Sequence, residues 1–305
     1  SFYAMSLESV QYNTPSNLGD SGNDVMYAGE GNDVALGGYG NDVIFGEGGE
    51  DILIGNSGND VLLGGAGIDT LYGDILENYD TPAKPGNDYL DGGADNDTIY
   101  GKEGDDIIIG GTEDDHLYGG EGKDTYIFNR GDGKDNIYDT SDNTKSNANI
   151  LRFGMGISEK DITLRLGSLM LDLGNGNAIH IEGFNQNDVF NSSSIGGFEF
   201  ADGTILSTTE LLSRGFDLDG TEGNDTIAGT NTTDRINGFG GNDQLWGMGS
   251  NDQIHGGMGD DYLEGDASIL DGQYHGDDYI YGDEGDDTIV GDGSDDTLVG
   301  GVGND

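Results

Sequence analysis

An aspartate recurs at intervals of nine residues, and this period constrains the fold more than any other feature of the chain. A glycine usually stands two residues before each aspartate, and an apolar residue stands two residues after it. A short period kept over many copies indicates stacked structural repeats. The aspartates of the first block are Asp24, Asp33, Asp42, Asp51, Asp60, Asp69, Asp88, Asp97, Asp106, Asp115 and Asp124.

A second block with the same period follows in the C-terminal part of the chain. Its aspartates are Asp225, Asp234, Asp243, Asp252, Asp261, Asp278, Asp287, Asp296 and Asp305. One insertion interrupts each block, at 74–86 and at 265–275. The sequence therefore divides into a lead-in (1–19), a first repeat block (20–128), a middle segment (129–216) and a second repeat block (217–305). Because the chain ends within a repeat, we interpret it as part of a longer protein.

Each unit reads as a glycine-rich turn of six residues followed by a strand of three. Glycine allows the positive φ angles and close approaches of tight turns, and the middle residue of the strand points inward. Nine residues then form half a coil, and eighteen form a full coil with two strands. The inward positions are Met26, Ala35, Ile44, Leu53, Leu62, Leu71, Leu90, Ile99, Ile108, Leu117, Ile227, Ile236, Leu245, Ile254, Leu263, Ile280, Ile289 and Leu298.

Hydrophobic burial alone does not hold such a unit together. One buried apolar side chain contributes about 1.5–3 kcal/mol, whereas each ordered residue costs about 1–2 kcal/mol of backbone entropy. The chain also has 60 acidic and 11 basic residues, a net charge of −49. This charge excludes charge-driven binding to nucleic acid or to anionic lipid. Low hydrophobicity with high net charge usually indicates disorder. The strict nine-residue period instead favours a chain that folds only when cations neutralise it.

The nonapeptide G-G-x-G-x-D-x-(apolar)-x resembles the RTX family of haemolysin-type calcium-binding repeats. Residues 64–72, Gly-Gly-Ala-Gly-Ile-Asp-Thr-Leu-Tyr, follow it closely. The resemblance implies an all-β fold with two right-handed parallel β-rolls, and calcium between the turns of successive coils. Calcium takes 6–8 oxygen ligands and mixes carboxylate with carbonyl oxygens. By analogy, the ligands are the repeated aspartates and backbone carbonyls of turn residues such as Gly37, Gly38, Gly40, Gly55, Gly64, Gly65, Gly92, Gly93, Gly119, Gly120, Gly256, Gly257, Gly282 and Gly291.

Aspartates eighteen residues apart are expected to lie on one edge of the roll and to share an ion. Two further pairs, Asp60 with Asp88 and Asp69 with Asp97, would form across the first insertion if the stack is unbroken. Counting gives about 16 sites as an upper limit. Turns that lack expected glycines, at Glu113, at Thr230 and Thr232, and at Ser294, are expected to bind more weakly.

The middle segment loses the period and is expected to form a small β-rich module that caps or spaces the rolls. Its predicted strands are 149–153, 162–166, 169–173, 178–184 and 195–200, and a helical turn is expected at 208–213. The stretches 154–158 and 198–203 resemble a domain found beside RTX repeats.

The outward positions of the first block are apolar, for example at Val25, Tyr27, Val43 and Ile52, whereas those of the second block are polar. A long apolar face predicts cover from the lead-in, the middle segment or another chain. The alternative is that flat sheets tolerate scattered apolar residues.

No catalytic motif stands out. The four histidines do not form a metal or catalytic motif, no G-x-S-x-G motif occurs, and there is no cysteine. We therefore expect no enzymatic activity in this chain, and no apolar run long enough to span a membrane is present. The resemblance implies a secreted, extracellular bacterial protein that leaves the cell by type I secretion and folds on meeting calcium. The parent is expected to be a toxin or adhesin. Alternatives are a secreted protease, lipase or polysaccharide-modifying enzyme, or a glycan- or protein-binding surface at the insertion loops.

Overall fold

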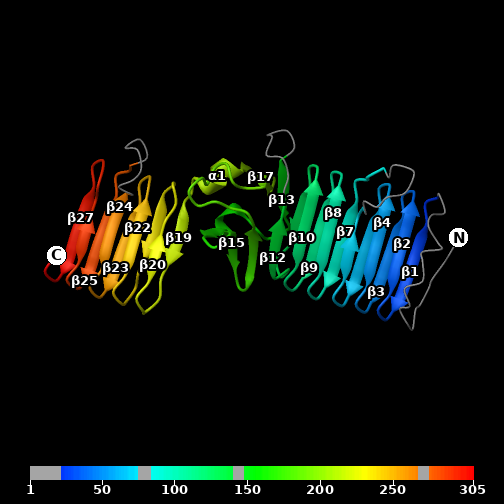
Figure 1. Cartoon of the computed structure of the whole chain (residues 1–305), viewed down its shortest axis with the longest axis horizontal. Helices are drawn as coiled ribbons and strands as arrows, with labels where there is room; N and C mark the ends of the chain where they lie inside the picture. Colours follow the sequence, from blue (N-terminus) through cyan, green and yellow to red (C-terminus); the bar gives the residue numbers. More distant parts are fainter. Residues whose placement is uncertain (1–21, 75–83, 140–147, 267–274) are drawn as a thin grey trace. The chain divides into compact units, whose positions relative to one another are not determined.

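Short strands joined by glycine-rich turns make up most of the computed structural model, which describes residues 22–74, 84–139, 148–266 and 275–305 (Figure 1). The chain forms two compact units. The first contains the residues up to 162 together with 173–183 and 194–207, and the second contains 163–172, 184–193 and 208–305. The predicted lead-in lies outside the described residues.

The first unit is a parallel β-roll with two sheets. One sheet contains, in order, β1 (Val25–Glu30), β3 (Val43–Gly48), β5 (Val61–Ala66), β7 (Tyr89–Ala94), β9 (Ile107–Thr112), β11 (Thr125–Phe128), β13 (Asn149–Phe153), β17 (Ile195–Glu199) and β18 (Ile205–Ser207). The other contains β2 (Val34–Tyr39), β4 (Ile52–Ser57), β6 (Thr70–Tyr72), β8 (Thr98–Glu103), β10 (His116–Glu121), β12 (Lys134–Tyr138) and β16 (Asn177–Ile181). Successive strands of the repeat block therefore alternate between the sheets, which confirms that nine residues make half a coil.

The insertion at 74–86 does not break the stack. Ile44 pairs with Leu62 in the ordinary register, and Leu62 then pairs with Leu90 across the insertion. Leu71 likewise pairs with Ile99 on the other sheet. The strands on both sides of the insertion therefore keep the same face toward the core.

The second unit contains a second parallel roll. One sheet runs through β19 (Phe216–Asp219), β21 (Asp234–Asn237), β23 (Gln253–Met258), β25 (Tyr279–Glu284) and β27 (Thr297–Val302). The other runs through β20 (Thr226–Ala228), β22 (Gln244–Met248), β24 (Tyr262–Asp266) and β26 (Thr288–Val290). This unit also contains α1 (Thr208–Leu212) and β14 (Thr163–Arg165), which pairs antiparallel with β15 (Leu169–Gly174).

The core of each roll is a column of single inward side chains. Leu53, Leu71 and Ile99 are completely buried in the first roll, as are Leu245 and Ile254 in the second. The exceptions lie at the ends of the columns, where the described residues include no further coil to cover the side chain. Met26 and Ala35 are half-buried in the first strands, and Leu298 in β27 is 48% exposed.

The middle segment does not stand as a separate module. Its strands β12, β13, β16 and β17 extend the two sheets of the first roll, and β12 pairs in parallel with β10. Residues 163–172 and 208–216 belong to the second unit instead. Strands form at or near all five predicted places, and α1 lies within the predicted helical turn. The two sheets of the first roll thus continue past the predicted boundary at residue 128.

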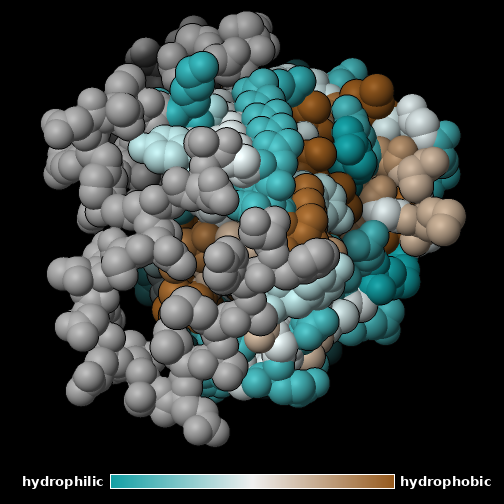
Figure 2. Space-filling model, turned by 90° about the vertical axis from the view of Figure 1, so that its right-hand side faces the viewer, coloured by the Kyte–Doolittle hydropathy of each residue, from teal (hydrophilic) through white to brown (hydrophobic). Residues whose placement is uncertain are grey.

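The outer faces of both sheets of the first roll carry apolar side chains. Val25 and Tyr27 in β1 are 40% and 46% exposed, and Ile52 in β4 is 40% exposed. Figure 2, which views the N-terminal end, shows hydrophobic patches among hydrophilic areas. Aromatic rings on these faces stack from coil to coil, as Tyr27 does on Phe45 with ring centroids 4.8 Å apart. What covers these faces stays a prediction, because the lead-in lies outside the described residues.

Candidate metal centre

The repeated aspartates form ladders along the edges of both rolls. The backbone N–H of each aspartate donates to Oδ1 of the aspartate one coil later, for example from Asp42 to Asp60 at 2.7 Å and from Asp51 to Asp69 at 2.8 Å. This bond joins all nine predicted pairs of the first block, including the two across the insertion. It also joins the seven predicted pairs of the second block. Aspartates one coil apart are therefore in direct contact.

The second carboxylate oxygen of most of these aspartates has no partner. It is buried and accepts no hydrogen bond, although a buried polar group without a partner is costly. Such an oxygen fits a cation that completes the site. The aspartates concerned are Asp33, Asp42, Asp51, Asp60, Asp69, Asp88, Asp97, Asp106, Asp115, Asp124, Asp243, Asp252, Asp261, Asp278 and Asp287.

A carbonyl oxygen faces the same small space as the free carboxylate oxygen. A Cβ atom added to Gly101 would lie 2.7 Å from the carbonyl oxygen of Gly119 and would also collide with Oδ2 of Asp106. A Cβ on Gly55 would lie 2.8 Å from the carbonyl oxygen of Gly73 and would collide with Oδ2 of Asp60. The first glycine of the turn is therefore required because a side chain would fill this space.

The oxygens around this space suit calcium. No three His, Cys, Asp or Glu side chains converge as a metal site within the described ranges. The turns instead bring carboxylate and backbone carbonyl oxygens together, a mixture that calcium accepts. When bound, calcium would supply the positive charge that these oxygens lack.

The electrostatics of the ladder also favour a cation. Burial, with smaller contributions from the carboxylates of Asp88 and Asp42, raises the pKa of Asp60 to about 7, although the Asp42 N–H opposes the shift. Burial likewise raises the pKa of Asp106 to about 8, with the charges of Asp88 and Asp124 contributing. A bound cation would favour the charged form of each carboxylate and bring these pKa values down.

Turns without the expected glycines behave in two ways. Glu113 takes a left-handed φ of 80°, as a glycine would, and Oδ2 of Asp115 in the same turn remains unpartnered. At Asp234 the arrangement differs, because the N–H and the hydroxyl of Thr230 donate to its Oδ2 at 2.5 and 3.1 Å. The two donors of Thr230 therefore take the place that a cation would otherwise have beside Oδ2 of Asp234. The sequence predicted weaker binding at both turns, and the geometry gives a reason only at Asp234.

The ladders extend to two residues that the nine-residue period did not reveal. Oδ1 of Asp135 accepts the N–H of Asp115 at 3.3 Å, and Oδ1 of Asn149 accepts the N–H of Asp124 at 2.7 Å. Asp135 stands twenty residues after Asp115, so it falls outside the count of nine. Gly133 stands two residues before Asp135 and Ile137 two residues after it, as in the repeat, and this local pattern could have identified Asp135.

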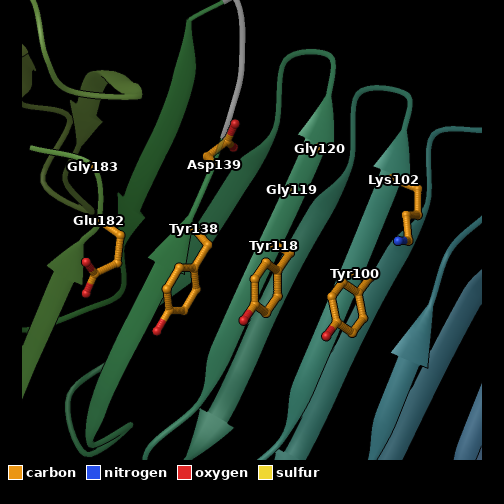
Figure 3. Close-up of a pocket in the computed structure, with 9 residues that line it drawn as sticks. All are labelled: Tyr100, Lys102, Tyr118, Gly119, Gly120, Tyr138, Asp139, Glu182 and Gly183. Atoms are coloured by element: carbon orange, nitrogen blue, oxygen red, sulfur yellow. The ribbon is translucent and has the colours of Figure 1, made fainter.

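A tyrosine ladder follows the outer face of the first roll. The rings of Tyr72, Tyr100, Tyr118 and Tyr138 stack with centroid distances of 4.9, 4.6 and 4.7 Å. Figure 3 shows three of these rings side by side above β8, β10 and β12. Tyr100, Tyr118 and Tyr138 line an open groove of about 460 Å³. Because the ring faces pack on one another, the groove presents ring edges and hydroxyls.

The comparison with known families settles which repeat this is. A model of the RTX calcium-binding nonapeptide repeat matches residues 18–53, 54–75, 83–108, 100–135, 219–254, 237–268 and 276–305. The chain belongs to this RTX family. Its two parallel rolls are accordingly RTX β-rolls, and the cation that fits their turns is calcium. No curated protein sequence matches the chain. Among the helices of the described part, none is long and apolar enough to cross a membrane.

Proposed function

We propose that this RTX chain is a calcium-dependent folding region of a secreted bacterial protein. The row of buried aspartate Oδ2 atoms without hydrogen-bond partners supports this proposal most directly. Each such oxygen disfavours the folded state until a cation compensates it. The free energy of calcium binding then becomes free energy of folding.

The charge of the chain explains the unfolded state that precedes binding. Without cations, a net charge of −49 opposes any compact state. The ladders would concentrate this repulsion between carboxylates. Their hydrogen bonds hold the carboxylates of Asp42, Asp60 and Asp88 in successive coils of the stack. The chain would therefore stay largely unfolded where calcium is scarce and close into rolls where calcium is abundant.

This behaviour suits passage through a narrow export channel. We infer that the chain leaves the cell unfolded by type I secretion and folds outside, as part of a larger toxin or adhesin. We also infer that it carries no catalytic site of its own. If the parent is instead a secreted enzyme, its catalytic groups would lie outside these rolls. A sequence of the parent protein with a catalytic motif before Ser1 would favour that alternative.

Circular dichroism during a calcium titration tests the proposal. The chelated chain is expected to lack the β signal, and added calcium is expected to restore it in a cooperative transition. Magnesium serves as the control, because it prefers octahedral sites and retains water. A chelated chain that keeps its β signal and its cooperative melting would contradict the proposal.

The insertion loops are a second candidate site, for a glycan or a protein. Their central residues lie outside the described ranges, so this alternative stays a prediction from sequence. A glycan array or pull-down with chains lacking 74–86 or 265–275 tests it, since binding must disappear with the loop.

A further inference from the structure

Both insertions open after an aspartate and close on a glycine that bonds back to it. In the first roll, the N–H of Gly86 donates to Oδ2 of Asp74 at 3.0 Å. In the second, the N–H of Gly276 donates to Oδ1 of Asp266 at 3.1 Å. Asp74 and Asp266 occupy the second position of their turns, each directly after a glycine. The two rolls thus contain the same arrangement at corresponding places.

A carboxylate at the same turn position faces solvent in two turns that no insertion interrupts. Glu47 and Asp292 stand at this position with φ angles of 77° and 67°, and both are exposed. Asp74 is only 3% exposed and Asp266 is completely buried. Neither is among the described residues with positive φ. The interrupted turns therefore direct a second carboxylate inward.

Each of these carboxylates keeps one oxygen without a hydrogen-bond partner. Oδ1 of Asp74 and Oδ2 of Asp266 are both buried and unpartnered. In the second roll, Nδ1 of His275 lies 3.8 Å from Oδ2 of Asp266, beyond hydrogen-bond distance. These free oxygens add to the free Oδ2 atoms of Asp88 and Asp278 in the same two turns.

The free aspartate oxygens of these two turns lie beside the glycines that precede Asp74 and Asp266. A Cβ atom added to Gly73 would collide with Oδ2 of Asp88 and would lie 2.6 Å from the carbonyl oxygen of Gly101. A Cβ atom added to Gly265 would collide with Oδ2 of Asp278 and would lie 3.0 Å from the carbonyl oxygen of Gly291. Asp74 and Asp266 directly follow these glycines, so their buried carboxylates belong to the turns that hold these oxygens.

We propose that the two interrupted turns are the tightest calcium sites of their rolls, with Asp74 and Asp266 each supplying one carboxylate more than an ordinary turn offers. The inference rests on the proposed calcium binding and deepens it. Affinity in calcium sites rises with the number of charged ligands. The first ions bound would then occupy one turn in each roll, and each insertion would mark that turn.

Calcium-binding isotherms of the whole chain, measured by competition with a chromophoric chelator, test this order. Asp74→Asn and Asp266→Asn are each expected to weaken one tight phase by roughly 10–100-fold, the range typical when a group supporting a metal site is lost. The double variant is expected to lose both tight phases. Glu47→Gln and Asp292→Asn remove a charge from the same turn position on the exposed side, and they are expected to leave the tight phases unchanged. Equal weakening by all four single variants would overturn the inference, because general charge would then explain the effect.

A second measurement needs no variant. In NMR spectra of the ¹⁵N-labelled chain, the amides of Gly86 and Gly276 are expected to reach their calcium-bound positions before those of Gly67 and Gly259, which hold the same place in uninterrupted turns. The reverse order, or simultaneous change, would overturn the inference. If the proposed calcium-dependent folding is wrong, circular dichroism of the unmodified chain will show no response to calcium. If only the order of binding is wrong, that response will remain, so the two failures are distinguishable.

Discussion

The backbone N–H of Asp60 donates to Oδ1 of Asp88 at 2.8 Å, although 28 residues separate them in sequence. The same bond joins Asp42 to Asp60 at 2.7 Å over 18 residues. The ladder therefore depends on the position of a residue in its coil and does not depend on the length of chain between coils. The roll tolerates an insertion at the third position of a turn because the aspartate at the sixth position, beyond the insertion, still accepts the hydrogen bond from the preceding coil.

Removing the first insertion is therefore expected to preserve the roll. Replacing 74–85 by two glycines would recreate an uninterrupted turn before Asp88. Shortening a loop by about ten residues reduces the entropic cost of closing it by only about 1.5 kcal/mol, because the cost grows with the logarithm of length. The change also removes Asp74, and a weakening of its calcium site by roughly 10–100-fold corresponds to about 1.4–2.8 kcal/mol. Urea unfolding at saturating calcium is therefore expected to show equal or slightly lower stability. A loss of several kcal/mol would mean that the insertion supports the roll.

Gly101→Ala is expected to weaken calcium binding and to destabilise the first roll. Its Cβ would enter the space between the Gly119 carbonyl and Oδ2 of Asp106. Overpacking of this kind costs about 1–3 kcal/mol. Gly197→Ala is a suitable control, because its Cβ would meet nothing closer than the Leu206 carbonyl at 3.9 Å. Calorimetric titration and urea unfolding measure both effects, and similar behaviour of the two variants would contradict the assignment of this space to the cation.

Asp234 and Asp243 are expected to differ in their contribution to calcium stoichiometry. Thr230 already donates to Oδ2 of Asp234, whereas Oδ2 of Asp243 has no partner. Asp243→Asn is expected to lower the number of ions counted by native mass spectrometry, and Asp234→Asn is expected to leave it unchanged. An equal loss in both variants would show that the Asp234 turn binds an ion despite its threonine.

The sequence predicted the coil, the inward column and the pairing of aspartates, because all three follow from one period. It did not reveal Asp135, which follows Asp115 by twenty residues where the period requires eighteen. The inward direction of Asp74 was also hidden, because the same turn position faces outward at Glu47. Backbone conformation decides that direction, and residue type does not.

Acidification is expected to stabilise the calcium-free roll. Burial raises the pKa of Asp97 and of Asp106 to about 8, from an ordinary value of 3.8, and neighbouring carboxylates contribute to the shift. Between these values the folded chain binds more protons than the unfolded chain, so its stability falls as pH rises and the contribution is lost above about pH 8. Circular dichroism of the chelated chain is therefore expected to show more β signal at about pH 5 than at about pH 8.

The same protons are expected to leave when calcium binds at about pH 5, where acidification keeps part of the calcium-free chain folded and these carboxyls protonated. Calorimetry detects their release as a dependence of the binding heat on the ionisation enthalpy of the buffer. Asp106→Asn is expected to reduce this release, because it removes one of the carboxyls that are protonated before calcium binds. Identical β signals at both pH values, together with no proton release, would show that these carboxylates are already charged in the calcium-free roll.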